Sequence, residues 1–254
     1  MNHFTLPEAA KRYDQSRPKV HGVIKSWLET ASGKSSFGKG IDIACGTGDS
    51  TKPLLEICDE VVGVDVSKEM IRFAEKKGIK VLLCAYEDIH LPEKFDLITT
   101  CMAFHWFDPV VALKKFKSLS NNGAIWLVYN FVFMGSMEDR KFNTWLLETY
   151  LKDYPSPPRG KSTGAVPIDD PEVRILKEDK GHLEITFARE ELIQYFTTQS
   201  NIEAAVKSGK TYGEIEIDLE ASMPIFDSGH RFRYSFTYGV YEYTREREGD
   251  DVFD

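Results

Sequence analysis

The chain has 254 residues, of which 42% are hydrophobic and 12% aromatic, and its formal net charge at pH 7 is −8. That length accommodates one large α/β domain, or one domain with an embedded cap, and a sizeable core. The negative charge excludes a broad basic surface of the kind that neutralises nucleic-acid phosphates.

The cysteines and the N-terminus indicate a protein of a reducing compartment. Cys45, Cys58, Cys84 and Cys101 have no CxxC or zinc-type spacing, so buried hydrophobic side chains are the simplest interpretation. The chain begins without a basic and apolar signal peptide, and no apolar run reaches membrane-spanning length. We therefore expect a soluble, cytoplasmic protein that binds neither nucleic acid nor a membrane.

Two helices are predicted near the N-terminus. Thr5 can cap the first, Pro7 suits its first turn, and Glu8 stands three residues after Thr5, as in a capping box. The second helix follows Pro18, and the polar stretch Ser32–Lys39 after it is predicted to be a loop. The apolar face of the second helix has helical spacing and consists of Val20, Val23, Ile24, Trp27 and Leu28.

Five apolar segments then alternate with helical patterns, as is typical of a doubly wound parallel sheet. The predicted strands are Ile41–Cys45, Val61–Asp65, Lys80–Cys84, Phe95–Thr100 and Ala124–Tyr129. The predicted helices are Thr51–Ile57, Lys68–Lys77 and the segment that carries Val110, Leu113, Phe116 and Leu119.

The pattern changes after Asn130. A helix with Phe142, Trp145, Leu146 and Tyr150 leads into the polar, proline-rich segment Asp153–Pro171. A segment of this length is usually a lid, a binding loop or disordered, and a lid and simple disorder both stay open here. The elements expected beyond it are a strand at His182–Phe187, a helix at Arg189–Thr197, helical segments to about Met223, a long strand at Arg231–Tyr243 and a frayed acidic end from Glu246.

The first predicted strand and the turn after it are the most informative stretch of the chain. A carboxylate, Asp42, lies inside the apolar strand, where it is costly unless something pairs with it. We therefore expect the turn Gly46-Thr47-Gly48 to receive a ligand with positive charge. Asp65 ends the next strand, where a carboxylate can accept hydrogen bonds from both hydroxyls of a ribose. Taken alone, the glycines can be backbone geometry and Asp65 a helix cap.

Two classes of cofactor suit a glycine turn followed by an acidic strand end. A dinucleotide fingerprint has a third glycine and places a helix N-terminus on a pyrophosphate. Here Thr51 stands at the third position, and Asp49 would add negative charge beside that anion. S-adenosylmethionine (SAM) brings an ammonium, a sulfonium and a ribose but no phosphate. The charge of the turn therefore favours SAM.

The order and spacing of these motifs resemble the class I SAM-dependent methyltransferases, in particular the small-molecule branch called methyltransferase type 11. The resemblance covers the chain from Tyr13 to Asn130 closely and the remainder more loosely. Ala44 departs from it, because many members of the family carry a glycine there. The segments that carry the resemblance are Tyr13–Pro18, Asp42–Gly48, Val64–Asp65, Glu87–Asp88, Phe95–Ile98 and Cys101–Asp108.

The resemblance implies a Rossmann-like α/β fold. Its sheet would be doubly wound, mostly parallel and seven-stranded, with a late antiparallel strand and a cap insertion. We expect a single domain over residues 1–254. Its parts would be N-terminal helices or a lid (1–39), the cofactor-binding core (40–130), a cap or insertion (131–181), and the C-terminal part of the sheet and helices (182–254).

The resemblance also implies which residues contact the cofactor. The methionine end of SAM would be surrounded by Asp42 and the backbone of Ala44, Gly46 and Gly48. Asp65 would hold the ribose. The adenine would lie beside Val66 and Met70, with Tyr86 and Glu87 at its edge. Cys101 and Met102 would lie near the methyl donor, and Tyr13 and Arg17 would belong to an N-terminal element that folds over the cofactor.

His105 follows the fourth predicted strand, where the transferred methyl group should emerge. It can orient the acceptor or take its proton, or it can pack with Trp106 and Phe107 at the start of the next helix. Methyl transfer is an in-line displacement, so alignment alone can supply much of the rate. His182 and His230 lack the spacing of metal ligands, and we expect no metal site.

Our leading hypothesis is a SAM-dependent methyltransferase with a small-molecule acceptor. An NAD-dependent oxidoreductase and a non-catalytic SAM-binding module are the alternatives. The methyl acceptor stays open among carboxylates, amines, phenols, thiols and carbon nucleophiles, and so does the oligomeric state.

Overall fold

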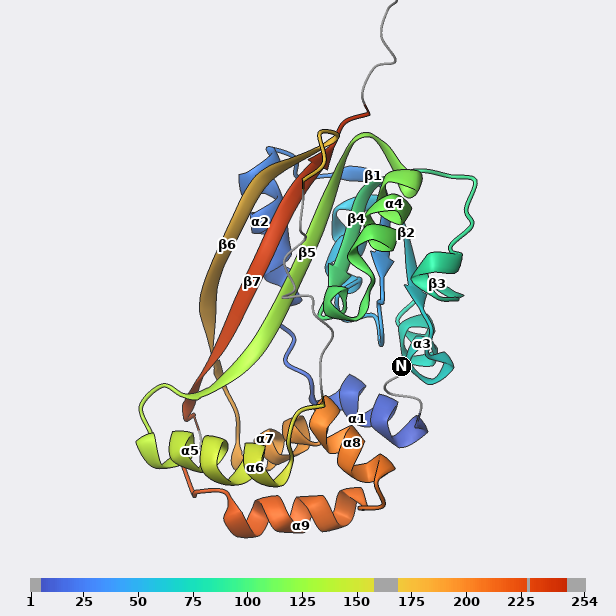
Figure 1. The fold of residues 1–254 in the computed structure, drawn as a ribbon. Coiled ribbons are helices and arrows are strands. Elements are labelled where there is room, and N and C mark those ends of the chain that lie inside the picture. Colours follow the sequence, from blue (N-terminus) through green and yellow to red (C-terminus); the bar gives the residue numbers. More distant parts are fainter. Residues whose placement is uncertain (1–5, 158–168, 228, 246–254) are drawn as a thin grey trace, which may run out of the picture.

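The strand order of the single large sheet determines where a ligand can bind. The computed structural model describes residues 6–157, 169–227 and 229–245, and its seven strands follow the order β3-β2-β1-β4-β5-β7-β6 (Figure 1). Strands β1 to β5 pair in parallel, whereas β7 runs antiparallel to both β5 and β6. The predicted doubly wound, mostly parallel seven-stranded sheet with a late antiparallel strand is confirmed. The strands are β1 Phe37–Ile43, β2 Cys58–Asp65, β3 Lys80–Leu83, β4 Phe95–Cys101, β5 Ser120–Ser136, β6 Val173–Thr186 and β7 Arg231–Tyr243.

Strands β5, β6 and β7 are longer than the other four strands of the sheet. β5 has 17 residues instead of the six predicted at Ala124–Tyr129, because its second half pairs with β7 as far as Ser136 opposite Phe232. β6 likewise begins at Val173, ahead of the predicted His182. β7 has the predicted bounds. Together β5, β7 and β6 form a long antiparallel extension of the sheet.

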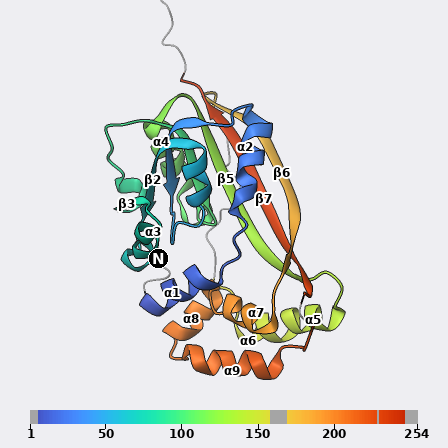
Figure 2. The same cartoon turned by 180° about the vertical axis from the view of Figure 1, so that it is seen from behind.

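The helices cover both faces of the sheet and one end of it. They are α1 Pro7–Ser16, α2 Ile24–Ser32, α3 Lys68–Lys76, α4 Pro109–Leu119, α5 Arg140–Trp145, α6 Leu151–Asp153, α7 Arg189–Phe196, α8 Ser200–Lys207 and α9 Tyr212–Ser222. α2 packs on the face that is seen from behind, where Trp27 stacks on Tyr238 with ring centroids 4.3 Å apart (Figure 2). α4 packs on the opposite face, where Phe116 meets Trp126 edge to face. Apolar burial on both faces explains the near-continuous apolar runs in the strands.

Two local predictions are wrong. The segment Thr51–Ile57 is not an α-helix but contains the short 3₁₀ turn η2, Lys52–Glu56, because Pro53 cannot donate its amide and β2 begins directly after Ile57. The predicted loop Ser32–Lys39 ends early, because Phe37 is buried and pairs with Cys58 in β2.

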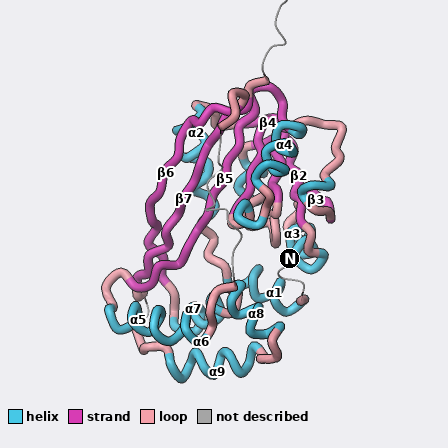
Figure 3. The backbone as a smooth tube through the Cα atoms, viewed as in Figure 1, coloured by secondary structure: helices cyan, strands magenta, loops and turns pink. Residues whose placement is uncertain are grey.

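A layer of helices lies across the lower end of the long strands (Figure 3). It combines α5, which continues through the π-helical turn Leu146–Tyr150 into α6, with α7, α8 and α9. α1 lies between this layer and α3. Most of the segment Asp153–Pro171, for which a lid was expected, lies outside the described residues, as do Thr5 and the acidic end. No helix within the described ranges is long and apolar enough to cross a membrane.

Candidate functional site

The carboxylate of Asp65 joins the ends of the two central strands. Its Oδ2 accepts a hydrogen bond of 2.8 Å from the amide of Gly46, in the turn after β1, and its Oδ1 accepts one of 2.8 Å from the amide of Ser67. Burial raises the pKa of Asp65, and the hydrogen bonds from Ser67 and Gly46 oppose that shift. The carboxylate therefore has a structural function in addition to any contact with a ligand.

A cavity of about 370 Å³ opens beside Asp65, at the carboxyl edge of the parallel strands, where open α/β sheets bind ligands. Its walls include two carboxylates, Asp65 and Glu87, and no lysine or arginine among the described residues. The ring of Tyr86 stacks on Phe107 at 4.1 Å, and its hydroxyl accepts a hydrogen bond from the amide of Asp108. The cavity is lined by Ile43, Ala44, Val64, Asp65, Val66, Cys84, Ala85, Tyr86, Glu87, Trp106 and Phe107. Five of the predicted cofactor residues thus come together here, namely Ala44, Asp65, Val66, Tyr86 and Glu87.

The two glycines of the turn serve different purposes. Both have positive φ, +54° at Gly46 and +85° at Gly48. A Cβ on Gly46 would stand 3.4 Å from Cε of the buried Met70. A Cβ on Gly48 would stand 3.0 Å from Cβ of Ala74, which is in α3, and 2.5 Å from Cδ1 of Ile79, which follows that helix. Gly48 is therefore required for close packing of the turn on α3, a requirement independent of any ligand.

Ala44 also adopts a left-handed conformation, with φ of +64°. This conformation favours glycine, the residue expected at this position from the family that the sequence resembles. Met102, after β4, has φ of +55°, and its Sδ accepts a hydrogen bond from the amide of Phe131. Backbone strain of this kind gathers at functional sites, and both residues stand just beyond the carboxyl ends of central strands.

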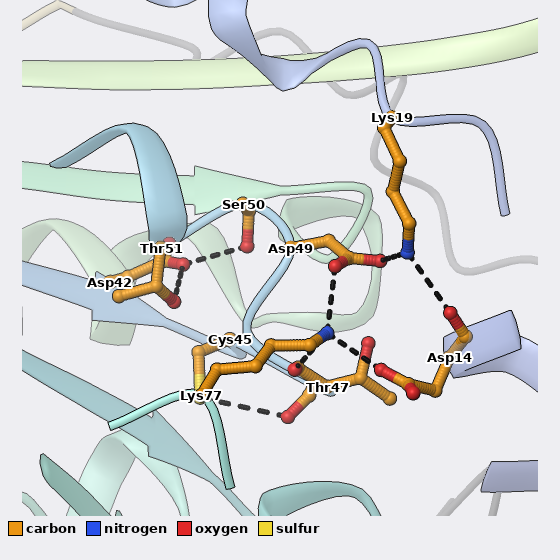
Figure 4. A network of polar contacts seen from close by, with 10 residues as sticks. Asp14, Lys19, Asp42, Cys45, Thr47, Asp49, Ser50, Thr51 and Lys77 are labelled. Atoms are coloured by element: carbon orange, nitrogen blue, oxygen red, sulfur yellow. Dashed lines mark hydrogen bonds and ion pairs between the residues drawn. The ribbon is translucent and has the colours of Figure 1, made fainter. Parts of the chain in front are cut away.

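The surroundings of Asp42 differ from those expected. The side chain is fully buried and accepts hydrogen bonds of 2.7 Å from Oγ of Ser50 and from Oγ1 of Thr51 (Figure 4). It accepts a third hydrogen bond, of 2.8 Å, from Oγ1 of Thr99. Burial raises the pKa of Asp42, and the three hydroxyls oppose the shift. Hydroxyl groups, not a cationic ligand, thus satisfy this carboxylate. Asp42 is also absent from the lining of the cavity.

The acidity of the turn is compensated as well. Asp49 forms ion pairs of 2.7 Å with both Lys19 and Lys77, and Lys77 reaches Asp14 of α1 at 2.6 Å (Figure 4). Lys77 also donates a hydrogen bond to the carbonyl of Thr47. Burial opposes ionisation of Asp49, but the two lysines prevail and lower its pKa. This network joins the N-terminal segment to the turn. The negative charge at the cavity comes from Asp65 and Glu87.

A second group of predicted residues lies near the end of β4 and the middle of β5, where Cys101 pairs with Tyr129, together with a histidine that sequence reasoning missed. Nδ1 of His21 lies 3.1 Å from the hydroxyl of Tyr129 and 3.9 Å from Sγ of Cys101. Burial lowers the pKa of His21 to about 4. Nothing in the sequence distinguishes His21 from a surface histidine, because its burial depends on how the segment after α1 folds back on β5.

Tyr13 and Arg17 belong to the same group, with the guanidinium carbon of Arg17 4.5 Å from the ring centroid of Tyr13. Burial raises the pKa of Tyr13 to about 12. Arg17 also donates a hydrogen bond of 2.8 Å to the carbonyl of Thr198, at the junction of α7 and α8. Both residues thus lie between α1 and the helical layer, outside the cavity that Asp65 lines.

His105 lies in the 3₁₀ turn Phe104–Trp106, and its ring contacts that of Trp106 with centroids 4.6 Å apart. It is not part of the cavity lining. The packing interpretation of His105 has direct support in this contact, while its role toward an acceptor stays a prediction. Within the described ranges no group of three or more His, Cys, Asp or Glu side chains is arranged to hold a metal ion.

The part of the chain that builds the turn and the cavity matches a known family. Residues 41–128 match the family model described as "Methyltransferase domain". The chain is 33% identical over 138 residues to an uncharacterized protein of Methanocaldococcus jannaschii, an alignment that covers 52% of this chain and 65% of that protein. It is 29% identical over 121 residues to malonyl-[acyl-carrier protein] O-methyltransferase of Hamiltonella defensa, with 46% and 42% covered.

A solved structure is similar over a larger part of the chain. It is from Anaeromyxobacter dehalogenans and is provisionally assigned as a type II methyltransferase. The superposition covers 90% of this chain and 97% of that one, with a TM-score of 0.66 and 20% identity, so the likeness concerns the fold. The aligned regions span about two fifths to two thirds of the length of the two curated relatives.

Gly48→Ala should destabilise the fold far more than Gly78→Ala. Both positions have positive φ, but a Cβ at Gly78 meets nothing within 4 Å. We expect a loss of about 3 kcal/mol for Gly48→Ala, from strain and overpacking together, and about 1 kcal/mol for Gly78→Ala. Urea unfolding of both variants measures the difference, and equal losses would contradict the packing role of Gly48.

The stability of the protein should fall as the pH drops from about 6.5 to about 4, in part because of His21. The unfolded chain takes up a proton on this histidine below its ordinary pKa of 6.5, whereas the folded protein resists protonation down to about 4. This difference amounts to at most about 3 kcal/mol. In urea unfolding at several pH values, His21→Gln should flatten the slope, whereas the same change at the exposed His90 should not. Parallel curves for His21→Gln and the wild type would contradict the burial argument.

Proposed function

We propose that this chain, which belongs over residues 41–128 to the methyltransferase domain family, transfers a methyl group from SAM to a small-molecule acceptor. The observation that carries the proposal is the cavity at the carboxyl edge of the sheet, with the Asp65 carboxylate held in its wall by the amide of Gly46. The activity and the acceptor of the whole chain are proposals, because the curated relatives align with only part of it.

The cavity suits the adenosine part of SAM. The Asp65 carboxylate uses one oxygen for each backbone amide, and each oxygen keeps a second lone pair for a ribose hydroxyl. Val66, Tyr86 and Phe107 provide apolar and aromatic walls for a flat base, and Glu87 stands at the rim as an acceptor for an exocyclic amine. The sulfonium of SAM supplies the electrophilic methyl group, so the residues of the chain need only bind and align the reactants.

The methionine end of SAM is proposed to lie beside the turn after β1 and the end of β4. Gly46, in that turn, and Met102, just after Cys101 at the end of β4, both have positive φ. Asp42 is proposed to act indirectly, by holding the turn in shape through Ser50 and Thr51. Gly48 acts in the same indirect way through its packing on α3.

The geometry disfavours the NAD-dependent oxidoreductase. A dinucleotide site needs an α-helix N-terminus that faces the pyrophosphate. Here the turn leads into the five-residue 3₁₀ turn η2, and the hydroxyl of Thr51, at the place of the third glycine, is engaged by Asp42. The described walls of the cavity also lack any cation for a phosphate. SAM, which has no phosphate, avoids all three difficulties.

Two observations support a small acceptor. The net charge of −8 does not suit binding of nucleic acid. The group around Arg17 is enclosed between α1, the sheet and the helical layer, an enclosure that suits a small molecule. The spacing of the four cysteines, which suits a reducing compartment, supports a cytoplasmic location. One relative that this chain resembles is named for O-methylation of a malonyl group on a carrier protein. A non-catalytic SAM-binding module is the second candidate, since no described side chain at the cavity is a dedicated base.

Isothermal titration calorimetry with S-adenosylhomocysteine and with NADH tests the cofactor. We expect one site for S-adenosylhomocysteine and no heat from NADH. Binding of NADH instead, or of neither compound by folded protein, would refute the proposal. Release of S-adenosylhomocysteine from SAM in the presence of an acceptor would then rule out the non-catalytic module.

Asp65→Ala should weaken S-adenosylhomocysteine binding by more than about tenfold, which corresponds to about 1.4 kcal/mol. It should also lower the unfolding free energy by about 1–3 kcal/mol, because the amides of Gly46 and Ser67 lose their acceptor. Glu60→Ala is the matched control, since Glu60 lies on the same strand with its side chain 71% exposed. Titration at a temperature where both variants are fully folded separates affinity from stability. Equal affinities for the two variants would remove Asp65 from the site.

A further inference from the structure

Four buried hydrogen-bond donors in or beside the helical layer have no acceptor within the described part of the chain. They are Nε of Arg17, Nε2 of Gln199, Nε of Arg189 and the hydroxyl of Tyr212. Arg17 and Gln199 are the two that lie beside Tyr195. Arg17 follows α1, and Gln199 is the residue just before α8. Buried donors are nearly always paired, so an orphan pair calls for an explanation.

The two donors belong to one cluster of aromatic side chains. Arg17 lies over the rings of Tyr13 and Tyr195, with its guanidinium carbon 4.5 Å and 5.4 Å from their centroids. Gln199 lies close enough to Tyr195 to affect the pKa of its hydroxyl. Tyr195 is therefore the side chain that the two orphan donors share. Tyr234 of β7, next to Tyr195 and Arg17, completes the cluster.

Arg17 is half-buried, its Nε is shielded from solvent, and it has no anionic partner within the described residues. Its guanidinium donates hydrogen bonds to the carbonyl of Thr198 and to the hydroxyl of Tyr234, and no carboxylate of residues 6–157, 169–227 or 229–245 forms an ion pair with it. Arg12, one turn earlier on α1, has an ion pair with Glu216 and hydrogen bonds to Gln194 and Thr197. A buried cation without a counter-charge costs several kcal/mol, whereas a carboxylate on its N–H groups offsets that cost.

We infer that Arg17 and Gln199 bind a carboxylate of the methyl acceptor, and that the acceptor is a small carboxylic acid. This inference rests on the proposed function and names its substrate class. Both donors lie outside residues 41–128, the part of the chain that matches the methyltransferase domain family. The competing occupant is the carboxylate of the cofactor itself, and the experiment below distinguishes the two sources.

Methylation of a carboxylate does not require any of the described side chains to act as a base. One carboxylate oxygen forms a bond to the methyl carbon, the bond between sulfur and that carbon breaks, and its electron pair stays on sulfur. The products are a methyl ester and S-adenosylhomocysteine, and no proton moves. The groups nearby are suited to remain neutral, because burial raises the pKa values of Tyr13, Tyr129 and Cys101 and lowers that of His21.

The experiment uses the full chain, SAM and a panel of acids of two to ten carbons, each paired with its carboxamide. Released S-adenosylhomocysteine gives the rate, and mass spectrometry identifies the ester. We expect turnover of acids only. Arg17→Gln and Gln199→Leu should each raise the KM for an acid by about tenfold or more, while the affinity for S-adenosylhomocysteine stays within about twofold.

Arg12→Gln is the matched control, because it removes a cation between α1 and the helical layer whose partners are all satisfied. It should lower stability and leave the KM unchanged. A second ligand, 5′-methylthioadenosine, lacks the cofactor's carboxylate. If Arg17→Gln weakens S-adenosylhomocysteine about tenfold but leaves methylthioadenosine binding unchanged, Arg17 holds the cofactor and the inference is overturned.

Two other results would also overturn it. One is turnover of carboxamides, amines or phenols at rates equal to those of the acids. The other is a panel without any ester product from a protein that binds S-adenosylhomocysteine normally. Failure of the wild-type protein to bind S-adenosylhomocysteine at all is a different result, and it refutes the proposed function itself.

Discussion

The buried carboxylate of Asp42 is the constraint on which the structure of the carboxyl edge of the sheet depends. It lies on β1 and accepts hydrogen bonds from Ser50 and Thr51, after the turn, and from Thr99 on β4. An unpaired buried carboxylate is costly, so the chain must return after the turn to the place where both hydroxyls reach it. The turn between these anchors is thereby fixed, and the amide of Gly46 is brought within 2.8 Å of Asp65. The position of Asp65 in the cavity wall thus depends on the hydrogen bonds that Asp42 accepts inside the sheet.

Charge is arranged differently on the two sides of the carboxyl edge. The cavity beside Asp65 has carboxylates without cations among the described residues, whereas Arg17 is a cation with which no described carboxylate forms an ion pair. Between them the ion pairs of Asp49 with Lys19 and Lys77 balance the charge of the turn itself. The first side is where we propose that the ribose of the cofactor binds, and the second is where we propose that an anionic acceptor binds. In the proposed in-line displacement the negative carboxylate of the acceptor reacts with the positive sulfonium of the cofactor, so that both charges are neutralised.

The sequence allowed the parallel part of the fold to be predicted because its determinants are local. Apolar runs bounded by turns mark β1 to β5, and the glycine turn and Asp65 stand at strand ends that only one topology brings together. The length of β5 was not predictable, because its second half is specified by pairing with β7, about a hundred residues later. The partners of Asp42 illustrate the same limit. The sequence contains Ser50 and Thr51 close to Asp42, but it does not predict which carboxylate accepts the hydrogen bonds of their hydroxyl groups. His21 and Gln199 owe their burial to long-range packing and carried no signal of their own.

The antiparallel extension of the sheet has a mechanical consequence. β5 and β7 pair from Ala124 opposite Tyr243 to Ser136 opposite Phe232, so the strands that carry the helical layer are continuous with the cofactor-binding sheet. The helical layer and Asp65 are therefore attached to one continuous sheet. The layer also reaches the turn after β1 through the N-terminal segment, because Arg17 donates to the carbonyl of Thr198 while Lys19 forms an ion pair with Asp49. The region proposed to bind the acceptor is thus joined to the region proposed to bind the donor both through the sheet and through the N-terminal segment.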